Sequence, residues 1–284
     1  MVGAPALAAH AATRSGAGLV RLVCPEGVLN EALTMVSQAT GRSLPTDATG
    51  ATIAGDSVGV LDAIIEETDV VVIGPGLGRG AGPAALALRV VQQKLKPVVV
   101  DADALNELAE TPQLTLDFHA PAIITPHPGE FARLAQALGM SSNATDDAKR
   151  PQAAEGLAQR LGCVVVLKGA RTVVSNGLRT WCDDTADSAL ATGGTGDVLA
   201  GLIGGLVAQH ARPITHELAR SKLGERTRHL GDDGKRSLFD LARCAVVAHA
   251  LAARLWREQH HASAGLTPME LAEHLPEAVT ALRS

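Results

Sequence analysis

Aromatic side chains are scarce in this sequence of 284 residues, which has three phenylalanines, two tryptophans and no tyrosine. Proteins that bind single-stranded nucleic acid usually stack the bases on aromatic side chains. Basic residues are also few relative to acidic ones: 25 Lys and Arg against 30 Asp and Glu give a formal net charge of −5, and no basic run occurs. These absences argue against nucleic acid, or an anionic membrane surface, as a partner.

The sequence also has few cysteines and no long, uninterrupted apolar runs. No pair among the four cysteines has the spacing of a metal site or a redox motif, so we expect reduced, mostly buried thiols in a cytoplasmic protein. The apolar runs are too short or too interrupted to span a bilayer, which argues against a membrane protein. The N-terminus lacks the basic region of a secretory signal.

Apolar segments and glycine are abundant: 46% of the residues are hydrophobic and 29 are glycine. Short apolar runs typical of buried parallel strands alternate with helix-prone segments. This pattern predicts a single α/β domain over residues 1–284, with a doubly wound, mainly parallel sheet flanked by helices. We expect helices at 4–15, 26–36, 58–67 and 81–95, strands at 19–23, 69–73, 97–101 and 163–167, a loop at 40–57, and a hairpin turning at 175–177.

Ligands of such sheets bind beyond the carboxyl ends of the strands, where this chain has several distinctive loops. The turn from Gly74 to Gly78 follows the second predicted strand. Either it is a purely structural turn or its backbone approaches a nucleotide or substrate; it does not match the dinucleotide fingerprint G-x-G-x-x-G. Asp101 and Asp103 follow the next strand, either as carboxylates facing Mg²⁺ or as a strand end and a helix cap.

Two further loops carry charged or titratable side chains. His127 lies between two prolines, which stiffen its loop and favour a contact with a ligand, and Glu130 falls in the first turn of the following helix. Lys168 ends an apolar strand and precedes a glycine, so it is either a phosphate contact or a solvated strand end.

The most informative stretch runs from Thr192 to Asp197, Thr-Gly-Gly-Thr-Gly-Asp, directly before an apolar helix. Glycines and the electropositive start of a helix together favour a phosphate site. Asp197 either caps this helix or acts as a base that takes a proton from an attacking hydroxyl or water, and the setting favours the base.

This combination of motifs resembles the ADP/ATP-dependent NAD(P)H-hydrate dehydratases of the ribokinase-like superfamily. The final glycine loop is shared with related small-molecule kinases, whereas the stretch Thr-Pro-His-Pro-Gly-Glu at 125–130 is far more specific. The resemblance covers nearly the whole chain. The matching segments are 15–20, 74–78, 101–106, 125–131, 167–169, 192–201 and 264–267.

The resemblance implies that (6S)-hydrated NADH or NADPH is dehydrated while ADP (or ATP) is consumed, usually with the help of Mg²⁺. Asp197 would be the catalytic base and would also contact the substrate. The resemblance implies nucleotide-binding roles for Lys168, Gly169, Ala170, Arg171, Thr172, Gly194, Thr195 and Gly196, and substrate-binding roles for Ala4, Gly76, Gly78 and His127. Ligands for the metal are not identified, and the expected assembly is a homo-oligomer such as a tetramer.

The chain departs from the family pattern in two places. The chain starts inside a loop that usually follows a first strand, so we expect that strand to be missing. The chain also has a charged insertion at about 213–237, in which we expect a solvated helix at 217–230. The alternatives are a small-alcohol kinase of the same superfamily and an inactive nucleotide-binding protein.

Overall fold

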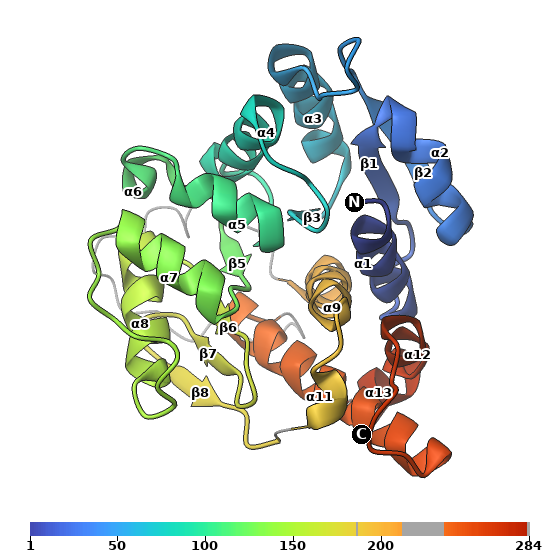
Figure 1. The fold of residues 1–284 in the computed structure, drawn as a ribbon, viewed down its shortest axis with the longest axis vertical. Coiled ribbons are helices and arrows are strands. Elements are labelled where there is room, and N and C mark those ends of the chain that lie inside the picture. The colour runs from blue at the N-terminus through green and yellow to red at the C-terminus, as the bar shows by residue number, and fades with distance from the viewer. Residues whose placement is uncertain (186, 212–235, 283–284) are drawn as a thin grey trace.

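A computed structural model describes residues 1–185, 187–211 and 236–282 of the chain (Figure 1). The helix expected at 217–230 therefore lies outside the described residues.

The centre of the fold is a six-stranded sheet whose strands follow one another in chain order. The first four strands are parallel, and the last two form an antiparallel hairpin at the predicted turn. The strands are β3 (Val71–Ile73), β4 (Val98–Val100), β5 (Ala122–Ile124), β6 (Val164–Leu167), β7 (Val173–Ser175) and β8 (Thr180–Cys182).

Helices cover both faces of this sheet, as the sequence predicts (Figure 1). One face carries the helices between successive parallel strands: α4 (Ala81–Gln92), α5 (Ala102–Ala109), α6 (Leu114–Asp117), α7 (Pro128–Ala137) and α8 (Arg150–Leu161). The other face carries α9 (Thr195–His210) and α11 (Leu238–His260), and α1 (Gly3–Arg14) packs against α9.

The apolar runs of the strands supply both cores. Successive side chains of a strand point to opposite faces, so a continuous apolar run feeds the two layers alternately. In β4, Val98 and Val100 belong to the core under the connecting helices, whereas Val99 belongs to the core under α9 and α11. These three valines are at most 1% exposed.

The N-terminal part forms a smaller parallel pair, β1 (Arg21–Pro25) and β2 (Thr40–Leu44), with α2 (Glu26–Met35) between them. The expectation of a loop over 40–57 is wrong: β2 occupies its start, and α3 (Ala54–Glu67) begins before its end. Only Leu44 of β2 is buried, so the strand lacks an apolar pattern and depends on its backbone pairing with β1. The remaining elements are η1 (Ser188–Leu190), α12 (Pro268–Glu273) and α13 (Leu275–Ala281).

The close contact between α1 and α9 depends on small residues in both helices. A Cβ on Gly201 would lie 2.0 Å from the carbonyl oxygen of Ala8, and one on Gly205 would lie 1.9 Å from Oγ of Ser15. The alanines of α1 and the glycines of α9 therefore let the two backbones touch. This contact ties the position of α9 to the N-terminal helix.

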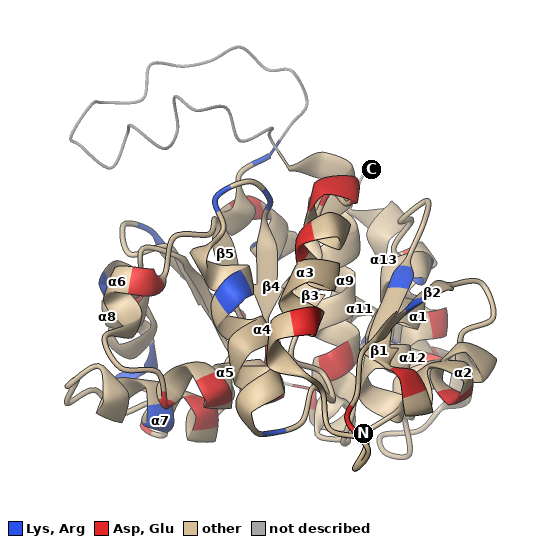
Figure 2. Ribbon diagram, turned by 90° about the horizontal axis from the view of Figure 1, so that it is seen from above, with Lys and Arg blue, Asp and Glu red and all other residues tan. Residues whose placement is uncertain are grey.

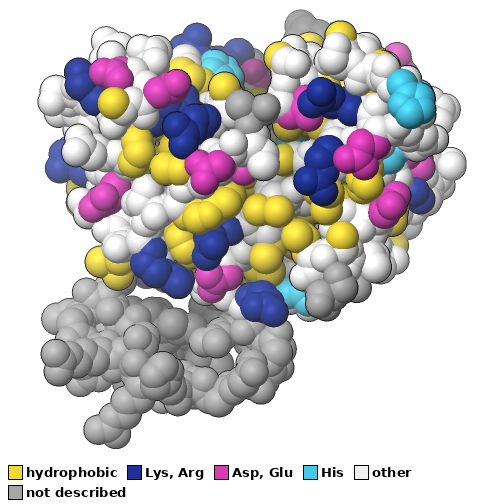
Figure 3. Space-filling model, turned by 90° about the horizontal axis from the view of Figure 1, so that it is seen from below, with side chains coloured by type: hydrophobic (Ala, Val, Ile, Leu, Met, Phe, Trp, Pro, Cys, Tyr) yellow, Lys and Arg dark blue, Asp and Glu magenta, His cyan; other side chains and the backbone are white. Residues whose placement is uncertain are grey.

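Charge is mixed over the surface. Acidic and basic residues are distributed over many elements (Figure 2), and on the face in Figure 3 they alternate around a band of hydrophobic side chains. Among the described residues, no helix is both long and apolar enough to cross a membrane.

Candidate active site

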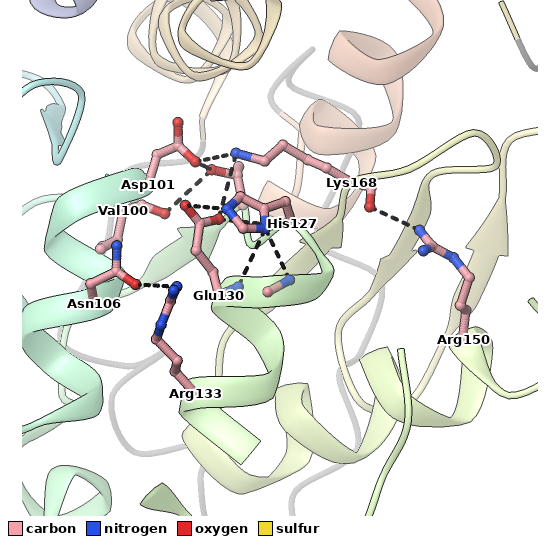
Figure 4. A network of polar contacts seen from close by, with 10 residues as sticks. Val100, Asp101, Asn106, His127, Glu130, Arg133, Arg150 and Lys168 are labelled. Atoms are coloured by element: carbon pink, nitrogen blue, oxygen red, sulfur yellow. Dashed lines mark hydrogen bonds and ion pairs between the residues drawn. The ribbon is translucent and has the colours of Figure 1, made fainter. Parts of the chain in front are cut away.

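The loops selected from the sequence meet at the carboxyl ends of β3 to β6. Lys168 lies at the centre of this region and joins loops that are distant in the sequence (Figure 4). Its Nζ is 2.5 Å from Oδ1 of Asp101, and the hydroxyl of Thr125 donates to the same oxygen at 2.7 Å. Asp101 is 1% exposed, so this is a buried ion pair, which requires such additional hydrogen bonds to offset its desolvation. A Cβ on Gly196 would lie 3.4 Å from Lys168 Nζ, which places the ammonium group beside the start of α9.

The N-terminus of α9 has no side-chain cap. Gly194 is the N-cap at a φ of +94°, and a Cβ there would press on Pro268 and Leu7 at 2.8 and 3.0 Å. The Thr195 hydroxyl donates back to the carbonyls of Leu190 and Thr192 rather than capping the helix. Free N–H groups at a helix start favour an anion, which supports the predicted phosphate site.

Asp197 lies in the first turn of α9 and is not the cap that one interpretation of the sequence suggests. Its pKa is raised to about 6, chiefly by burial and also by the carboxylates of Asp101 and Asp103, while Lys168 opposes the shift. A carboxylate whose pKa is this close to neutrality can accept a proton and still be mostly ionised at pH 7. Its environment therefore suits a general base.

His127 and Glu130 cap the N-terminus of α7 reciprocally. Nδ1 of His127 accepts hydrogen bonds from the backbone N–H groups of Gly129 and Glu130, and the Glu130 carboxylate accepts from the His127 N–H at 2.7 Å. Since Nδ1 is an acceptor, the proton of the neutral ring is on Nε2, 3.3 Å from Oε1 of Glu130.

Burial dominates the titration of this pair. It raises the pKa of Glu130 to about 7, with Lys168 opposing the shift, and lowers the pKa of His127. Burial therefore favours the neutral form of both groups. The His127 side chain is half exposed, which leaves it accessible to a ligand as well as serving as a cap.

The glycine turn after β3 has the structural role that the sequence left open, and an approach of its backbone to a ligand stays a prediction. Gly74 and Gly76 are structural: a Cβ on Gly74 would lie 1.7 Å from the Asp101 carbonyl oxygen, and one on Gly76 would lie 2.7 Å from Cδ of Pro5 in α1. A Cβ on Gly78 would meet nothing within 4 Å, so this residue faces open space. The turn therefore links α1 to β4 and presents Gly78 to the site.

Asp103 differs from the expected helix cap. Asp101 is the N-cap of α5, without a side-chain cap bond, and the Asp103 carboxylate accepts the Gly78 N–H at 2.9 Å. With regard to a metal centre, the described part of the chain contains no cluster of three His, Cys, Asp or Glu side chains able to hold an ion.

A pocket opens between the β6–β7 turn, the start of α9 and α11. Among its lining residues are five of the predicted nucleotide-binding residues: Lys168, Gly169, Ala170, Thr172 and Gly196. Arg171 instead pairs with Asp184 at the surface at 2.9 Å. Sequence reasoning missed the opposite wall, which includes Asp183, Thr185, Asp187, Val246 and His249.

His249 supports the start of α9 from beneath. Its Nε2 is 2.9 Å from the carbonyl oxygen of Thr195, and burial lowers its pKa to about 4. The ring is therefore neutral and donates its Nε2 proton to that carbonyl. No sequence signal identifies this residue, because a histidine within an alanine-rich helix is ordinarily a packing residue.

Comparison with known proteins identifies the family of this chain. A family model described as NAD(P)H-hydrate dehydratase matches residues 1–277. The bifunctional NAD(P)H-hydrate repair enzymes Nnr of Moorella thermoacetica and Salinibacter ruber are 39% and 43% identical over 215 and 231 residues. These matches cover 75% and 78% of this chain but 39% and 40% of the relatives, so the chain spans less than half the length of these curated relatives.

Solved structures show the same fold. The ADP/ATP-dependent NAD(P)H-hydrate dehydratase of Bacillus subtilis, co-crystallised with ATP/Mg²⁺, superposes with a TM-score of 0.72 at 28% identity, covering 99% of this chain and 87% of that one. A ribokinase-like protein of Enterococcus faecalis superposes with a TM-score of 0.67 at 21% identity, covering 98% of this chain and 82% of that one. This superposition confirms the predicted ribokinase-like fold. The match over almost all its length shows that this chain belongs to the NAD(P)H-hydrate dehydratase family.

Proposed function

We propose that this chain dehydrates (6S)-hydrated NADH or NADPH to the normal cofactor while ADP is converted to AMP and phosphate. The observation that carries the proposal is the start of α9. There, an uncapped helix N-terminus, the Lys168 ammonium group and the Asp197 carboxyl, with its pKa of about 6, lie together. Membership of the family supports the choice of substrate.

The chemistry that we assign to Asp197 resembles that of a kinase. Its carboxylate takes the proton of the ring hydroxyl, whose oxygen then attacks the terminal phosphorus of ADP, and AMP leaves with the electrons of the broken P–O bond. The Gly196 N–H and Lys168 oppose the negative charge that develops on the phosphoryl oxygens. Phosphate then leaves the ring carbon with the electrons of the broken C–O bond, the neighbouring carbon loses a proton to solvent, and the double bond of the reduced nicotinamide forms between these two carbons.

The two ligands would occupy different sides of Asp197. We assign the adenine nucleotide to the pocket beside the turn from Lys168 to Thr172, with Gly194 and Thr195 shaping the phosphate end. The hydrated nicotinamide would lie against Gly78 and the exposed ring of His127, with Ala4 and Gly76 forming the structural contact behind.

Mg²⁺ fits this arrangement only as a companion of the nucleotide. Magnesium usually keeps several waters and binds through one or two carboxylates together with substrate phosphates. Asp101 is held by Lys168 and Thr125, and Asp103 by the Gly78 N–H, so in these carboxylates only the remaining oxygens are available. The ion would neutralise phosphate charge. Proton transfer by Asp197 and charge stabilisation by Lys168 are the contributions of the protein itself.

The test is turnover of the purified chain. Hydrated NADH with ADP and Mg²⁺ should regain the absorbance of reduced nicotinamide, with one AMP and one phosphate released per cofactor restored; ATP is tested in parallel. A stable phosphorylated product would instead indicate a small-alcohol kinase. Nucleotide binding without any turnover would indicate an inactive binding protein. A homo-oligomer is also expected, and sedimentation of the same sample tests it.

A further inference from the structure

Arg150, the first residue of α8, is buried directly behind the β6–β7 turn (Figure 4). It is 4% exposed. Its Nη2 donates to the carbonyl oxygens of Leu167, Lys168 and Arg171 at 3.0, 3.0 and 3.3 Å, and its Nη1 donates to that of Ala144 at 3.1 Å. One guanidinium group thus holds three carbonyls of the segment that leads into and forms the turn.

These hydrogen bonds determine where the N–H groups of the turn point. No described peptide bond is cis, and in a trans peptide the C=O and the following N–H point in opposite directions. Because the carbonyls of Lys168 and Arg171 point toward Arg150, the N–H groups of Gly169 and Thr172 point away from it. Gly169 and Thr172 line the pocket, whereas Arg150 does not. The guanidinium therefore directs two backbone donors toward the pocket side of the turn.

The charge of Arg150 is little neutralised. Its ion-pair partner among the described residues is the exposed Asp147, 3.9 Å from Nε, and Nε itself has no hydrogen-bond partner there. A cation balanced mainly by carbonyl dipoles leaves a positive potential behind the turn, which favours an anion in front of it. Gly169 leaves room for the guanidinium group, because a Cβ at this position would lie 2.5 Å from Nη2 of Arg150.

We propose that Arg150 is a positioning residue for the adenine nucleotide: it preorganises the Lys168–Thr172 turn so that its N–H groups face the bound ligand. This inference rests on the proposed function, because it takes the pocket to be the nucleotide site. Lysine cannot replace arginine fully here, since a single ammonium group lacks the planar fork that reaches several carbonyls at once.

The experiment is a calorimetric titration of the folded full chain with ADP and with ATP. We expect Arg150→Lys to raise the nucleotide Kd by about tenfold and Arg150→Met to raise it by at least that much. The affinity for hydrated NADH should stay within about twofold of wild type. Arg160→Lys is the matched control, because Arg160 lies on the same helix and donates to the Leu138 carbonyl at 3.3 Å, away from the turn.

Each result of these titrations either supports or overturns the inference about Arg150. Weaker nucleotide binding with unchanged hydrated-NADH binding and a normal control supports the inference. Equal nucleotide affinity in wild type and Arg150→Lys overturns it and leaves the proposed function intact. Parallel losses for both ligands with a lowered melting temperature also overturn it, because they indicate general destabilisation. Should Arg150→Met fail to fold, Arg150→Lys alone decides. A wild-type chain that binds no adenine nucleotide overturns both proposals.

Discussion

Two of the helices that begin at the candidate active site, α7 and α9, have N-termini that are built differently. At α7 the N–H groups are satisfied within the protein, because His127 and Glu130 cap each other's backbone. At α9 the cap position is Gly194 with no side-chain bond, and the Thr195 hydroxyl turns back to carbonyls of the preceding loop. One helix start is closed by its own side chains and the other is open.

This difference supports the proposed phosphate site at α9. An open N-terminus retains its donors and its positive potential for an anion, whereas a capped one has used them. The groups that support the two ends also differ: a neutral histidine, His249, beneath α9, and a carboxyl, Glu130, within the cap of α7. Their pKa values are shifted by the same cause, burial, but with opposite consequences for stability.

The largest expected effect is that of Asp197→Asn at the open end. Turnover should fall by roughly two to four orders of magnitude through loss of the base. Nucleotide affinity should hold or rise slightly, because repulsion between carboxylate and phosphate falls. Since Asp197 makes no cap bond, stability should not decline. Rate, calorimetry and thermal unfolding on one sample test this; a rate within about tenfold of wild type would remove Asp197 as the base.

His249 should make the folded chain less stable in acid. Its pKa is about 4 when folded and about 6.5 when unfolded. The unfolded chain therefore binds a proton that the folded chain does not, and this contribution to stability, complete above pH 6.5, is lost as pH falls toward 4. The loss amounts to about 3 kcal/mol. Denaturant unfolding of wild type and His249→Gln across this range tests it: their difference should shrink toward low pH, and a constant difference would contradict the prediction.

Glu130 should act in the opposite direction at the capped end. Its folded pKa of about 7 exceeds the unfolded value of about 4.5, so the folded chain keeps a proton that the unfolded chain releases. Its contribution is complete below pH 4.5 and is lost as pH rises to 7, at a cost of about 3 kcal/mol at most. Glu130→Gln keeps an acceptor for the His127 N–H. Relative to wild type, the variant should gain stability as pH rises from 4.5 to 7; parallel curves would refute this.

The smallest effect is expected for His127→Ala. Loss of the cap should lower the free energy of unfolding by about 1 kcal/mol. If His127 also contacts substrate, the KM for hydrated NADH should rise while that for the nucleotide stays unchanged. Ser237→Ala is the control, since Ser237 caps α11 by accepting the Asp240 N–H. A stability loss in both variants with no change in either KM would restrict His127 to capping.

The sequence predicted the central fold well and the edges less well. The valine-rich strands β4 and β6 were found because parallel strands covered on both faces are continuous apolar runs. Strand β2 was missed because four of its five residues are exposed. The sequence left Asp103 open between a carboxylate facing Mg²⁺ and a helix cap, because a local pattern cannot show that its carboxylate reaches the Gly78 N–H on another loop.

By itself, the sequence determined the α/β class, the alternation of strands and helices in the central sheet, and the loops that carry Gly78, His127, Lys168 and Asp197, because each follows from a local pattern of apolar runs, glycines and prolines. Only the tertiary structure decided which side chains meet. The pairing of Lys168 with Asp101 joins residues 67 positions apart, and the contact of His249 with Thr195 joins residues 54 apart. Burial in the packed fold shifts the pKa values of Asp197 and His249, and burial is a property of the whole fold rather than of any segment.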